Sequence, residues 1–470
     1  MNIFFGTDGW RGLLDDEINH NTVAIVAQAF SDYCLRKYSN PIVAVGFDGR
    51  KYSDEFASIF SSVLSGNKIK VFLSDKIIPT PVLSYAVKKL GLTAGVMITA
   101  SHNPPNYNGI KFKANYGGPF FTEETLAVEE LLFKNIIKTN NDNVERYDFM
   151  PLYIEQIESM INFELIKKSG VKVIIDSMGG AGKRILEDIL SMHGISAQTI
   201  FSKPDINFYG RNAEPISINL QPLSEKIVMD DFSIGLATDG DADRIGVVLD
   251  NGEFLSAQET ILLIADYVVN FKKLTGHFVK TSSVTNKLLK FQDDKRKVID
   301  VQVGFKYICE KMLAEDVLFG CEESGGFGYK NHIPERDGIL SALILCELLS
   351  SSGFTKITDL IAAKKEEYGE IFYNRLDLKY EKSNRLNILP ELFVTPPKNI
   401  FDFSIKEILS FYSSRGIING LKFNLSSDAS RWLLLRSSET EPLIRIYAEG
   451  NSNDEVESII NFGKQLILEH

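Results

Sequence analysis

Short apolar runs alternate with helical patterns along most of this chain, and this alternation limits the possible folds more than any other feature. An apolar run of strand length followed by a helical segment, repeated several times, predicts a parallel sheet with helices on its faces. In the first part of the chain, apolar runs cover 42–46, 69–73 and 94–98, and helical patterns cover 21–38, 53–64 and 80–90. The sequence therefore favours an α/β fold.

The pattern breaks and restarts, which predicts several domains. A polar stretch over 138–147 ends the first unit, a second unit starts with the apolar run 171–175, and a third runs from 255 to about 364. After about residue 368 the pattern changes to that of a smaller α+β unit. At 470 residues, the chain is long enough for three to four domains. We predict the limits 1–147, 148–250, 251–367 and 368–470.

Composition excludes several classes of protein. The net charge is −11, from 51 basic and 62 acidic residues, which disfavours binding to nucleic acid or to an anionic membrane. No apolar run reaches ~18 residues, so we expect no transmembrane helix. The N-terminus has no basic region of a signal peptide, and the four scattered cysteines show no C-x-x-C spacing. These features predict a cytoplasmic protein that binds phosphates, if at all, through local clusters.

A glycine-rich segment opens the chain. Residues 5–12 contain three glycines, and Arg11 stands among them. Glycines indicate tight backbone turns. Arg11 is a candidate contact for an anion, although a plain N-terminal turn explains the segment as well.

Ser101 lies at the apex of a loop that follows an apolar run, with Pro104 and Pro105 restricting the backbone behind it. A serine hydroxyl needs a base, a metal or a prior covalent group before it transfers anything. The neighbouring His102 is expected to point the opposite way in an extended loop. Lys111 could bring an ammonium group close to Ser101. A turn serine that caps its own loop is an equally good interpretation of this segment alone.

Three aspartates follow a second apolar run, at Asp239, Asp241 and Asp243. Carboxylates at alternate positions in a small-residue loop can converge on one hard cation, and Mg²⁺ prefers such oxygens. An EF-hand is excluded because its loop needs glycine where Arg244 stands. A solvated acidic turn is the alternative, but it rarely places three aspartates directly after a buried strand.

Two further loops carry polar groups after apolar runs. In the first, Glu322 and Ser324 stand in a glycine-rich turn whose acceptors and donors suit sugar hydroxyls. In the second, Arg436 is followed by Ser438 and Thr440, which together could cradle a phosphate. An acidic turn and a surface turn are the respective alternatives. A serine, a metal site, a sugar loop and a phosphate cradle at strand ends together indicate phosphoryl transfer on a phosphosugar.

With these four loops in view, the chain resembles the α-D-phosphohexomutase family of phosphoglucomutases and phosphomannomutases over essentially its full length. The motifs that carry the resemblance are T-A-S-H-N-P at 99–104, D-G-D-A-D-R at 239–244, E-x-S-G at 322–325 and R-x-S-x-T-E-P at 436–442. The resemblance implies three similar α/β domains with mixed sheets plus a C-terminal α+β domain, with all four around a central cleft. It implies a monomer or homodimer whose partner is a small phosphosugar, not nucleic acid or a membrane.

The resemblance also implies a mechanism of two transfers. Ser101 would be a phosphoserine that gives its phosphoryl group to a hexose 1-phosphate or 6-phosphate. The resulting hexose 1,6-bisphosphate would return its other phosphate to Ser101. The same bisphosphate would also serve as activator. One Mg²⁺ would be held by the Ser101 phosphate, Asp239, Asp241 and Asp243. Lys111 would be the general acid or base.

Further roles follow from the same motifs. A lysine acting as base near neutrality needs a pKa lowered by about two to three units from its free value. His102 and Arg11 would assist Lys111. The implied substrate contacts are Glu322 and Ser324 for sugar hydroxyls, Arg436, Ser438 and Thr440 for the phosphate that is not transferred, and Lys306 and Arg244 for further phosphate contacts.

Two positions depart from the family pattern. Glu439 stands in the phosphate loop where Gly or Asn is common, and we predict that its side chain points away from the phosphate. Gly326 stands where many mannose- or glucosamine-using members have His, which favours glucose. Phosphomannomutase and phosphoglucosamine mutase activities remain alternatives. Two rivals are an enzyme with an aspartate nucleophile and a non-catalytic phosphosugar-binding protein, and the second would not need all four loops.

Overall fold

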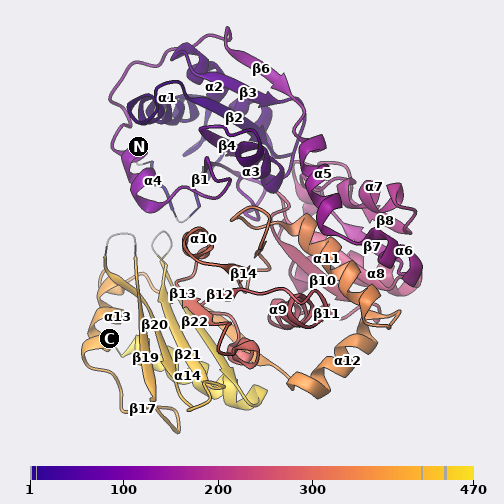
Figure 1. Ribbon diagram of the computed structural model, residues 1–470. Coiled ribbons are helices and arrows are strands. Elements are labelled where there is room, and N and C mark those ends of the chain that lie inside the picture. Colours follow the sequence, from indigo (N-terminus) through magenta and orange to yellow (C-terminus); the bar gives the residue numbers. More distant parts are fainter. Residues whose placement is uncertain (1–2, 7, 414–415, 439–441, 470) are drawn as a thin grey trace.

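The chain folds into four units, each built around its own main β-sheet (Figure 1). The computed structural model describes residues 3–6, 8–413, 416–438 and 442–469. The first three units are α/β with mixed sheets and the fourth is rich in β-strands, which confirms the predicted fold class. Within the described residues, no helix combines the length and apolarity needed to cross a lipid bilayer.

The first unit contains a six-stranded sheet in the order β1-β5-β4-β2-β3-β6. Strands β2, β3, β4 and β6 are parallel, whereas β5 runs antiparallel to both β4 and β1. The sheet is mixed because the connection from β4 to β5 is too short for a crossover helix. The elements are β1 (Trp10–Leu13), α1 (His20–Lys37), β2 (Ile42–Phe47), α2 (Ser53–Gly66), β3 (Lys70–Ser74), α3 (Thr80–Lys89), β4 (Ala94–Ile98), β5 (Tyr107–Ala114), α4 (Thr122–Glu129) and β6 (Val144–Tyr147).

The second unit has a five-stranded sheet in the order β11-β10-β9-β7-β8. Strands β9 and β10 are antiparallel neighbours with Thr238 opposite Ile245, so the aspartate loop is their tight connection. The elements are α5 (Met150–Met160), α6 (Phe163–Ser169), β7 (Val173–Asp176), α7 (Ile185–Met192), β8 (Ala197–Ile200), η1 (Phe208–Gly210), η2 (Ser217–Asn219), α8 (Gln221–Met229), β9 (Ile234–Thr238), β10 (Ile245–Leu249) and β11 (Phe254–Leu255).

The third unit has a four-stranded sheet in the order β13-β12-β14-β15. Its β14–β15 hairpin, with Cys321 opposite Phe327, carries the glycine-rich loop. The elements are α9 (Ala257–Asp266), η3 (Tyr267–Phe271), β12 (His277–Thr281), η4 (Asn286–Phe291), β13 (Val298–Val301), α10 (Phe305–Ala314), β14 (Val317–Cys321), β15 (Phe327–Tyr329), α11 (Gly338–Ser351) and α12 (Ile357–Tyr368).

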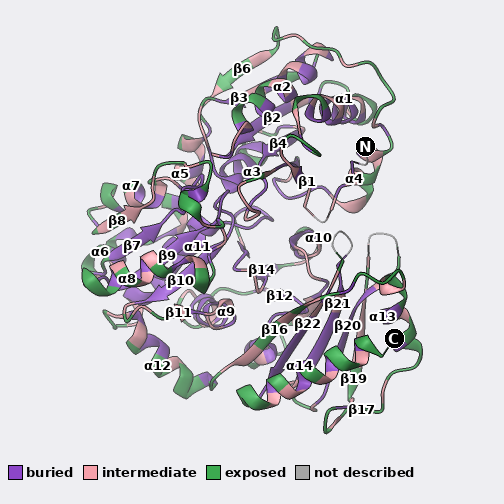
Figure 2. Ribbon diagram, turned by 180° about the vertical axis from the view of Figure 1, so that it is seen from behind, coloured by how far each residue is buried: buried purple, intermediate pink, exposed green. Residues whose placement is uncertain are grey.

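Helix α11 joins the second and third units. It is buried along nearly its whole length and packs against α6, α7, β9 and β10 as well as α9, so the two units share one hydrophobic core (Figure 2). An apolar helix without a polar face fits this position between two layers. The predicted domain limits stay predictions.

The fourth unit has an antiparallel sheet in the order β16-β22-β21-β20-β19, with α14 packed on it. Glu449 ties it to the third unit: its carboxylate accepts hydrogen bonds from Thr285 Oγ1 (2.5 Å) and the Asn286 N–H (3.0 Å). The elements are β16 (Phe372–Lys379), α13 (Arg385–Val394), β17 (Asn399–Ile400), β18 (Phe403–Ser404), β19 (Glu407–Tyr412), β20 (Ile418–Asn424), β21 (Trp432–Ser437), β22 (Leu443–Gly450) and α14 (Asn453–Leu468).

Candidate active site

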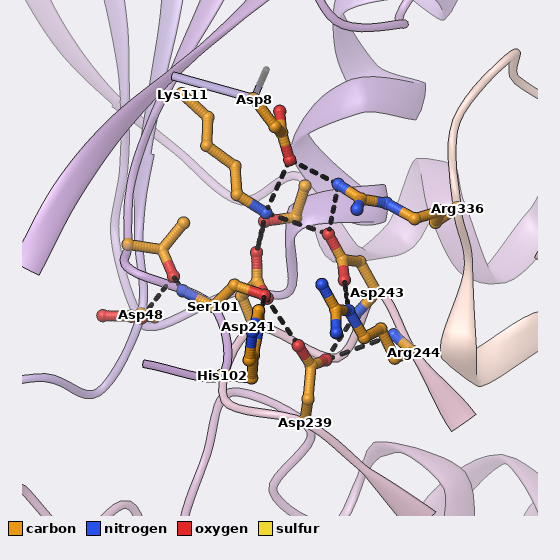
Figure 3. A network of polar contacts seen from close by, with 12 residues as sticks. Asp8, Asp48, Ser101, His102, Lys111, Asp239, Asp241, Asp243, Arg244 and Arg336 are labelled. Carbon is orange, nitrogen blue, oxygen red and sulfur yellow. Dashed lines mark hydrogen bonds and ion pairs between the residues drawn. The ribbon is translucent and has the colours of Figure 1, made fainter. Parts of the chain in front are cut away.

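Ser101 lies in the connection between β4 and β5 and is fully buried. Its backbone is in the left-handed region, with φ of 52°. Its N–H donates to Thr99 Oγ1 (2.9 Å), and the Thr99 hydroxyl donates to Asp48 Oδ2 (2.6 Å). Its own hydroxyl donates to Asp239 Oδ2 at 2.8 Å (Figure 3). The hydroxyl thus reaches across to the second unit instead of capping its own loop.

The three aspartates of the β9–β10 loop converge as the sequence predicts. Asp239, Asp241 and Asp243 are fully buried, and one carboxylate oxygen from each lies within 4.8 Å of the other two. Within the described part of the chain, the Oδ1 atoms of Asp241 and Asp243 are buried without a hydrogen-bond partner. Burial and the two neighbouring carboxylates raise the pKa of Asp239 well above its usual range. Buried, unpaired carboxylate oxygens of this kind fit a hard divalent cation.

Gly240 allows the two loops to meet. A side chain at this position would overlap the carbonyl oxygen of Ser101. The Asp239 carboxylate orders the rest of the loop, because its Oδ1 accepts hydrogen bonds from the N–H groups of Asp243 (3.0 Å) and Arg244 (3.1 Å). A glycine between two aspartates is therefore required for the close approach of Ser101.

Lys111, on β5, faces the aspartates from the first unit. Its Nζ lies 2.8 Å from Asp241 Oδ2 and 2.9 Å from Asp243 Oδ2, and 3.3 Å from Asp8 Oδ2 (Figure 3). Burial alone would lower the pKa of Lys111, but these three carboxylates outweigh it and raise the pKa above the usual lysine value. The lowered pKa that a base near neutrality needs is therefore not present, and the structure holds Lys111 as an ammonium.

Asp8 and Arg336 belong to the same network, although the sequence did not single them out. The Arg336 guanidinium pairs with Asp8 and with Asp243 Oδ2 (3.0 Å), and its Nη1 lies 3.6 Å from Glu322 Oε2. The buried Arg336 side chain of the third unit thus joins Asp8 of the first unit to Asp243 of the second (Figure 3). A charged residue in a loop before a strand or helix carries no sequence signal of where its side chain points. The available signal was only that Asp8 lies within the glycine-rich segment 5–12 and Arg336 within the polar segment 332–338.

The glycine-rich loop of the third unit lies against the aspartate loop. The Ile245 N–H donates to the carbonyl of Gly325 (3.0 Å), and Arg244 and Gly326 form a β-bridge. Burial raises the pKa of Glu322 to about 7, against the opposing effect of Arg336. Ser324 is half-buried in the same turn. Backbone pairing therefore brings the predicted sugar loop to the predicted metal loop.

His102 and Arg11 both contact the Ser101 loop. His102 Nδ1 is 3.5 Å from Ser101 Oγ, so the expectation that His102 points away was wrong. The expectation assumed an extended loop, whereas the left-handed backbone of Ser101 turns the imidazole towards the hydroxyl. Burial, Arg244, Arg11 and Lys111 lower the pKa of His102 well below its usual range, which keeps the ring neutral. Arg11 Nη1 donates to Asn103 Oδ1 at 2.9 Å.

Comparison with known proteins identifies the family. Family models described as Phosphoglucomutase/phosphomannomutase, alpha/beta/alpha domains I, II and III match residues 2–138, 151–252 and 256–368. A Sulfurisphaera tokodaii protein named phosphoglucosamine/phosphogalactosamine mutase is 31% identical, with 99% of each chain covered. The chain belongs to the phosphoglucomutase/phosphomannomutase family.

Two other members of the phosphoglucomutase/phosphomannomutase family are similar to this chain along its whole length. A Thermococcus kodakarensis protein named phosphoglucomutase/phosphomannomutase is 29% identical over 100% of this chain and 99% of its own. A crystal structure from Thermus thermophilus, named as a phosphomannomutase, is 32% identical with a TM-score of 0.85, and 99% of both chains is covered. The names of these relatives therefore refer to different sugars.

The remaining predicted residues of this phosphoglucomutase/phosphomannomutase family member lie further out. Lys306, at the start of α10, donates to Thr122 Oγ1 of the first unit at 2.9 Å. Arg436 lies on β21 of the fourth unit, directly opposite Arg445 on β22. The Ser438 N–H pairs with the Leu443 carbonyl at 3.0 Å and fixes the base of the loop. Arg445 is a further candidate phosphate contact that the motif missed. Thr440 and Glu439 lie outside the described residues, so the predicted orientation of Glu439 stays a prediction.

Proposed function

We propose that this chain is a phosphohexomutase that interconverts hexose 1-phosphates and hexose 6-phosphates through a phosphoserine at Ser101. The contact between Ser101 Oγ and Asp239 Oδ2, in a loop that also holds Asp241 and Asp243, carries the proposal. It puts the serine hydroxyl of the T-A-S-H-N-P loop against the aspartate cluster, where a phosphoryl group would meet a metal. Family membership supports the same conclusion.

One Mg²⁺ fits the aspartate cluster. Asp239, Asp241 and Asp243 would hold it together with an oxygen on Ser101, and the buried Oδ1 atoms of Asp241 and Asp243 would gain a partner from it. When bound, such an ion neutralises charge on the transferring phosphoryl group.

The chain's own cations would position the phosphoryl group. Lys111, held as an ammonium, would stabilise negative charge on the oxygen that leaves or arrives at phosphorus and could donate a proton to it. Arg11, fixed through Asn103, would contact the same group from the other side of the loop. His102 stays neutral and would orient the Ser101 oxygen. Added hexose 1,6-bisphosphate would supply the first phosphate to Ser101. The same compound would form as the intermediate between the two transfers.

The substrate would span the third and fourth units. Glu322 and Ser324 would bind sugar hydroxyls, and Arg436, Ser438 and Thr440 would bind the phosphate that is not being transferred. Lys306 and Arg244 would add phosphate contacts. Arginine and short hydroxyl donors suit a phosphate because they present several hydrogen bonds at fixed geometry.

Glucose is the first candidate sugar, because Gly326 lacks the His of many mannose- and glucosamine-using members. The space beside Gly326 is filled by Arg336, whose Cδ would lie 2.5 Å from a Cβ at position 326. Glucosamine is the second candidate, because a relative at 31% identity is named for glucosamine and galactosamine phosphates. The four free, buried cysteines fit a reducing compartment, so we place the reaction in the cytoplasm.

The test is turnover of α-glucose 1-phosphate, α-mannose 1-phosphate and glucosamine 1-phosphate side by side, with Mg²⁺ and a trace of glucose 1,6-bisphosphate. We expect conversion to the 6-phosphates, with the highest kcat/KM for glucose 1-phosphate, and none by Ser101→Ala. A protein that binds these sugars without converting any of them would be a sensor, and the proposal would fail.

A further inference from the structure

Arg50 binds the backbone of the Ser101 loop at four points. Its Nη2 donates to the carbonyl oxygens of Ser101 and Asn103, both at 2.6 Å. Its Nη1 donates to those of Pro104 (2.9 Å) and Tyr107 (3.0 Å). Four carbonyls from the loop and from the start of β5 therefore converge on one guanidinium. The arginine thus satisfies polar backbone groups that this irregular loop creates.

Arg50 is itself held rigidly. Its side chain is fully buried, its Nε lies 3.4 Å from Asp48 Oδ2, and its N–H donates to Asp48 Oδ1 at 3.0 Å. The guanidinium carbon lies 4.7 Å from the centre of the Phe208 ring, which belongs to the second unit. The same Asp48 accepts the Thr99 hydroxyl that receives the Ser101 N–H. The turn after β2 thus holds both the N–H and the carbonyl of Ser101.

The Ser101 peptide is enclosed from both sides. The Arg50 guanidinium binds its carbonyl oxygen, and Gly240 of the aspartate loop packs against the same oxygen. Ser101 has a left-handed φ of 52°, a conformation that is uncommon for a residue with a Cβ and that its surroundings stabilise here. The structure offers Arg50, Asp48 and Gly240 as those surroundings.

We propose that Arg50 is a positioning residue for phosphoryl transfer: it holds the Ser101 loop in the left-handed conformation that places Oγ at the aspartate cluster. The inference rests on the proposed function, because it assigns Arg50 a role in that reaction. Lysine cannot replace it. An ammonium presents three donors from one atom, whereas the guanidinium presents five in a planar fork that reaches all four carbonyls. Arg50 acts through Ser101 and needs no contact with substrate.

Arg211 provides a matched control. It is an arginine of the second unit with 12% of its side chain exposed, paired with Asp176 at 2.7 Å, and it donates to the Asn219 carbonyl at 2.7 Å. Its guanidinium carbon lies 4.4 Å from the Phe201 ring. Arg211 therefore shares the acidic partner, carbonyl contact and aromatic neighbour of Arg50 but lies on another loop. Loss of either arginine should lower thermal stability, and only loss of Arg50 should affect Ser101.

The experiment compares Arg50→Ala, Arg50→Lys, Arg211→Ala and Arg211→Lys with the wild-type protein. It measures kcat and KM on α-glucose 1-phosphate with glucose 1,6-bisphosphate, the melting temperature, and hydrogen exchange of peptides covering 99–107. We expect the Arg50 variants to lose about 10²-fold in kcat with little change in KM, because a small displacement of a reacting group has that effect. Free guanidinium at low concentration should partly restore Arg50→Ala, and exchange over 99–107 should be faster in both Arg50 variants.

Equal losses of kcat in the Arg50 and Arg211 variants would overturn the proposal, as would unchanged exchange over 99–107 in Arg50→Lys. If Arg50→Ala does not fold, Arg50→Lys gives the same comparison. The two proposals fail separately. A wild-type protein that converts none of the three hexose 1-phosphates contradicts the proposed function, and hydrogen exchange still decides whether Arg50 holds the loop.

Discussion

Arg336 occupies the space beside Gly326: a Cβ at position 326 would lie 2.5 Å from Arg336 Cδ and 3.3 Å from Glu322 Oε2. The absence of a side chain at position 326 therefore allows the guanidinium to reach Glu322, Asp243 and Asp8. The identity of position 326 and the presence of Arg336 are linked, and the pair rather than Gly326 alone shapes the predicted sugar loop.

Replacing Gly326 with His should displace Arg336. We expect Gly326→His to lower the free energy of unfolding by about 1–3 kcal/mol through overpacking and to raise KM for α-glucose 1-phosphate. Removing the arginine stem in the double variant Gly326→His/Arg336→Ala should recover part of that stability. Denaturant unfolding and steady-state kinetics measure both effects. A single variant as stable as the wild type would show that the two residues do not share this space.

Magnesium should compensate for the loss of Lys111. Lys111→Met removes the ammonium that pairs with the buried carboxylate of Asp241, and Asp243 keeps its pairing with Arg336. Breaking the buried pairs of Lys111 should cost about 3–5 kcal/mol of stability. Mg²⁺ added to this variant should raise its melting temperature more than that of the wild type, and EDTA should reverse the effect. Lys113→Met is the matched control, since Lys113 is equally buried on β5 but pairs with Glu335. A similar response to Mg²⁺ in both variants would argue against a metal at the aspartates.

Stability should depend on pH through Glu322. Its pKa is 4.5 in a free chain and about 7 when folded, so the folded state binds the proton more tightly. The contribution of Glu322 to the free energy of unfolding is favourable below about pH 4.5 and is lost as the pH rises through 7. Glu322→Gln should therefore gain stability over the wild type between these values, reaching about 3 kcal/mol above pH 7. Chemical denaturation at a series of pH values tests this, with the exposed Glu130→Gln as control. A stability difference that does not change with pH would contradict it.

Asp8 should matter for catalysis although no motif marks it. It pairs with both Lys111 and Arg336 and is not one of the proposed metal ligands. Asp8→Asn keeps the size of the side chain but removes the charge that orients both cations, and we expect kcat to fall by about tenfold or more. Asp148→Asn, which removes an exposed partner of Lys76, should leave kcat unchanged. Equal activity of the two variants would remove Asp8 from the site.

The sequence reveals the parts of the site that are local. Ser101 and the aspartates Asp239, Asp241 and Asp243 stand in short loops directly after apolar strands, and such loops bring their side chains together. Arg50 and Arg336 give no comparable signal, because their partners lie far away in the sequence and their own segments look like ordinary charged turns. Whether an arginine is buried against four backbone carbonyls or faces solvent depends on tertiary packing, which no local sequence pattern indicates.

The fold shows the same division. The alternation of strands and helices predicts the three α/β units, but it does not predict that β5 returns antiparallel after Ser101. The backbone of Ser101 was also unpredictable, because a left-handed residue other than glycine has no sequence signature. That conformation reversed the expected direction of His102. The ammonium state of Lys111 likewise depends on three carboxylates from separate segments.

The most direct test of the central claim is whether phosphate passes through Ser101. The protein is incubated with glucose 1,6-bisphosphate and Mg²⁺, and the phosphorylated residue is located by mass spectrometry before and after addition of α-glucose 1-phosphate. We predict phosphate on Ser101 alone, its loss to the sugar on addition of substrate, and neither event in Ser101→Ala. Phosphate on an aspartate, or conversion of the sugar by Ser101→Ala at the wild-type rate, would contradict the account.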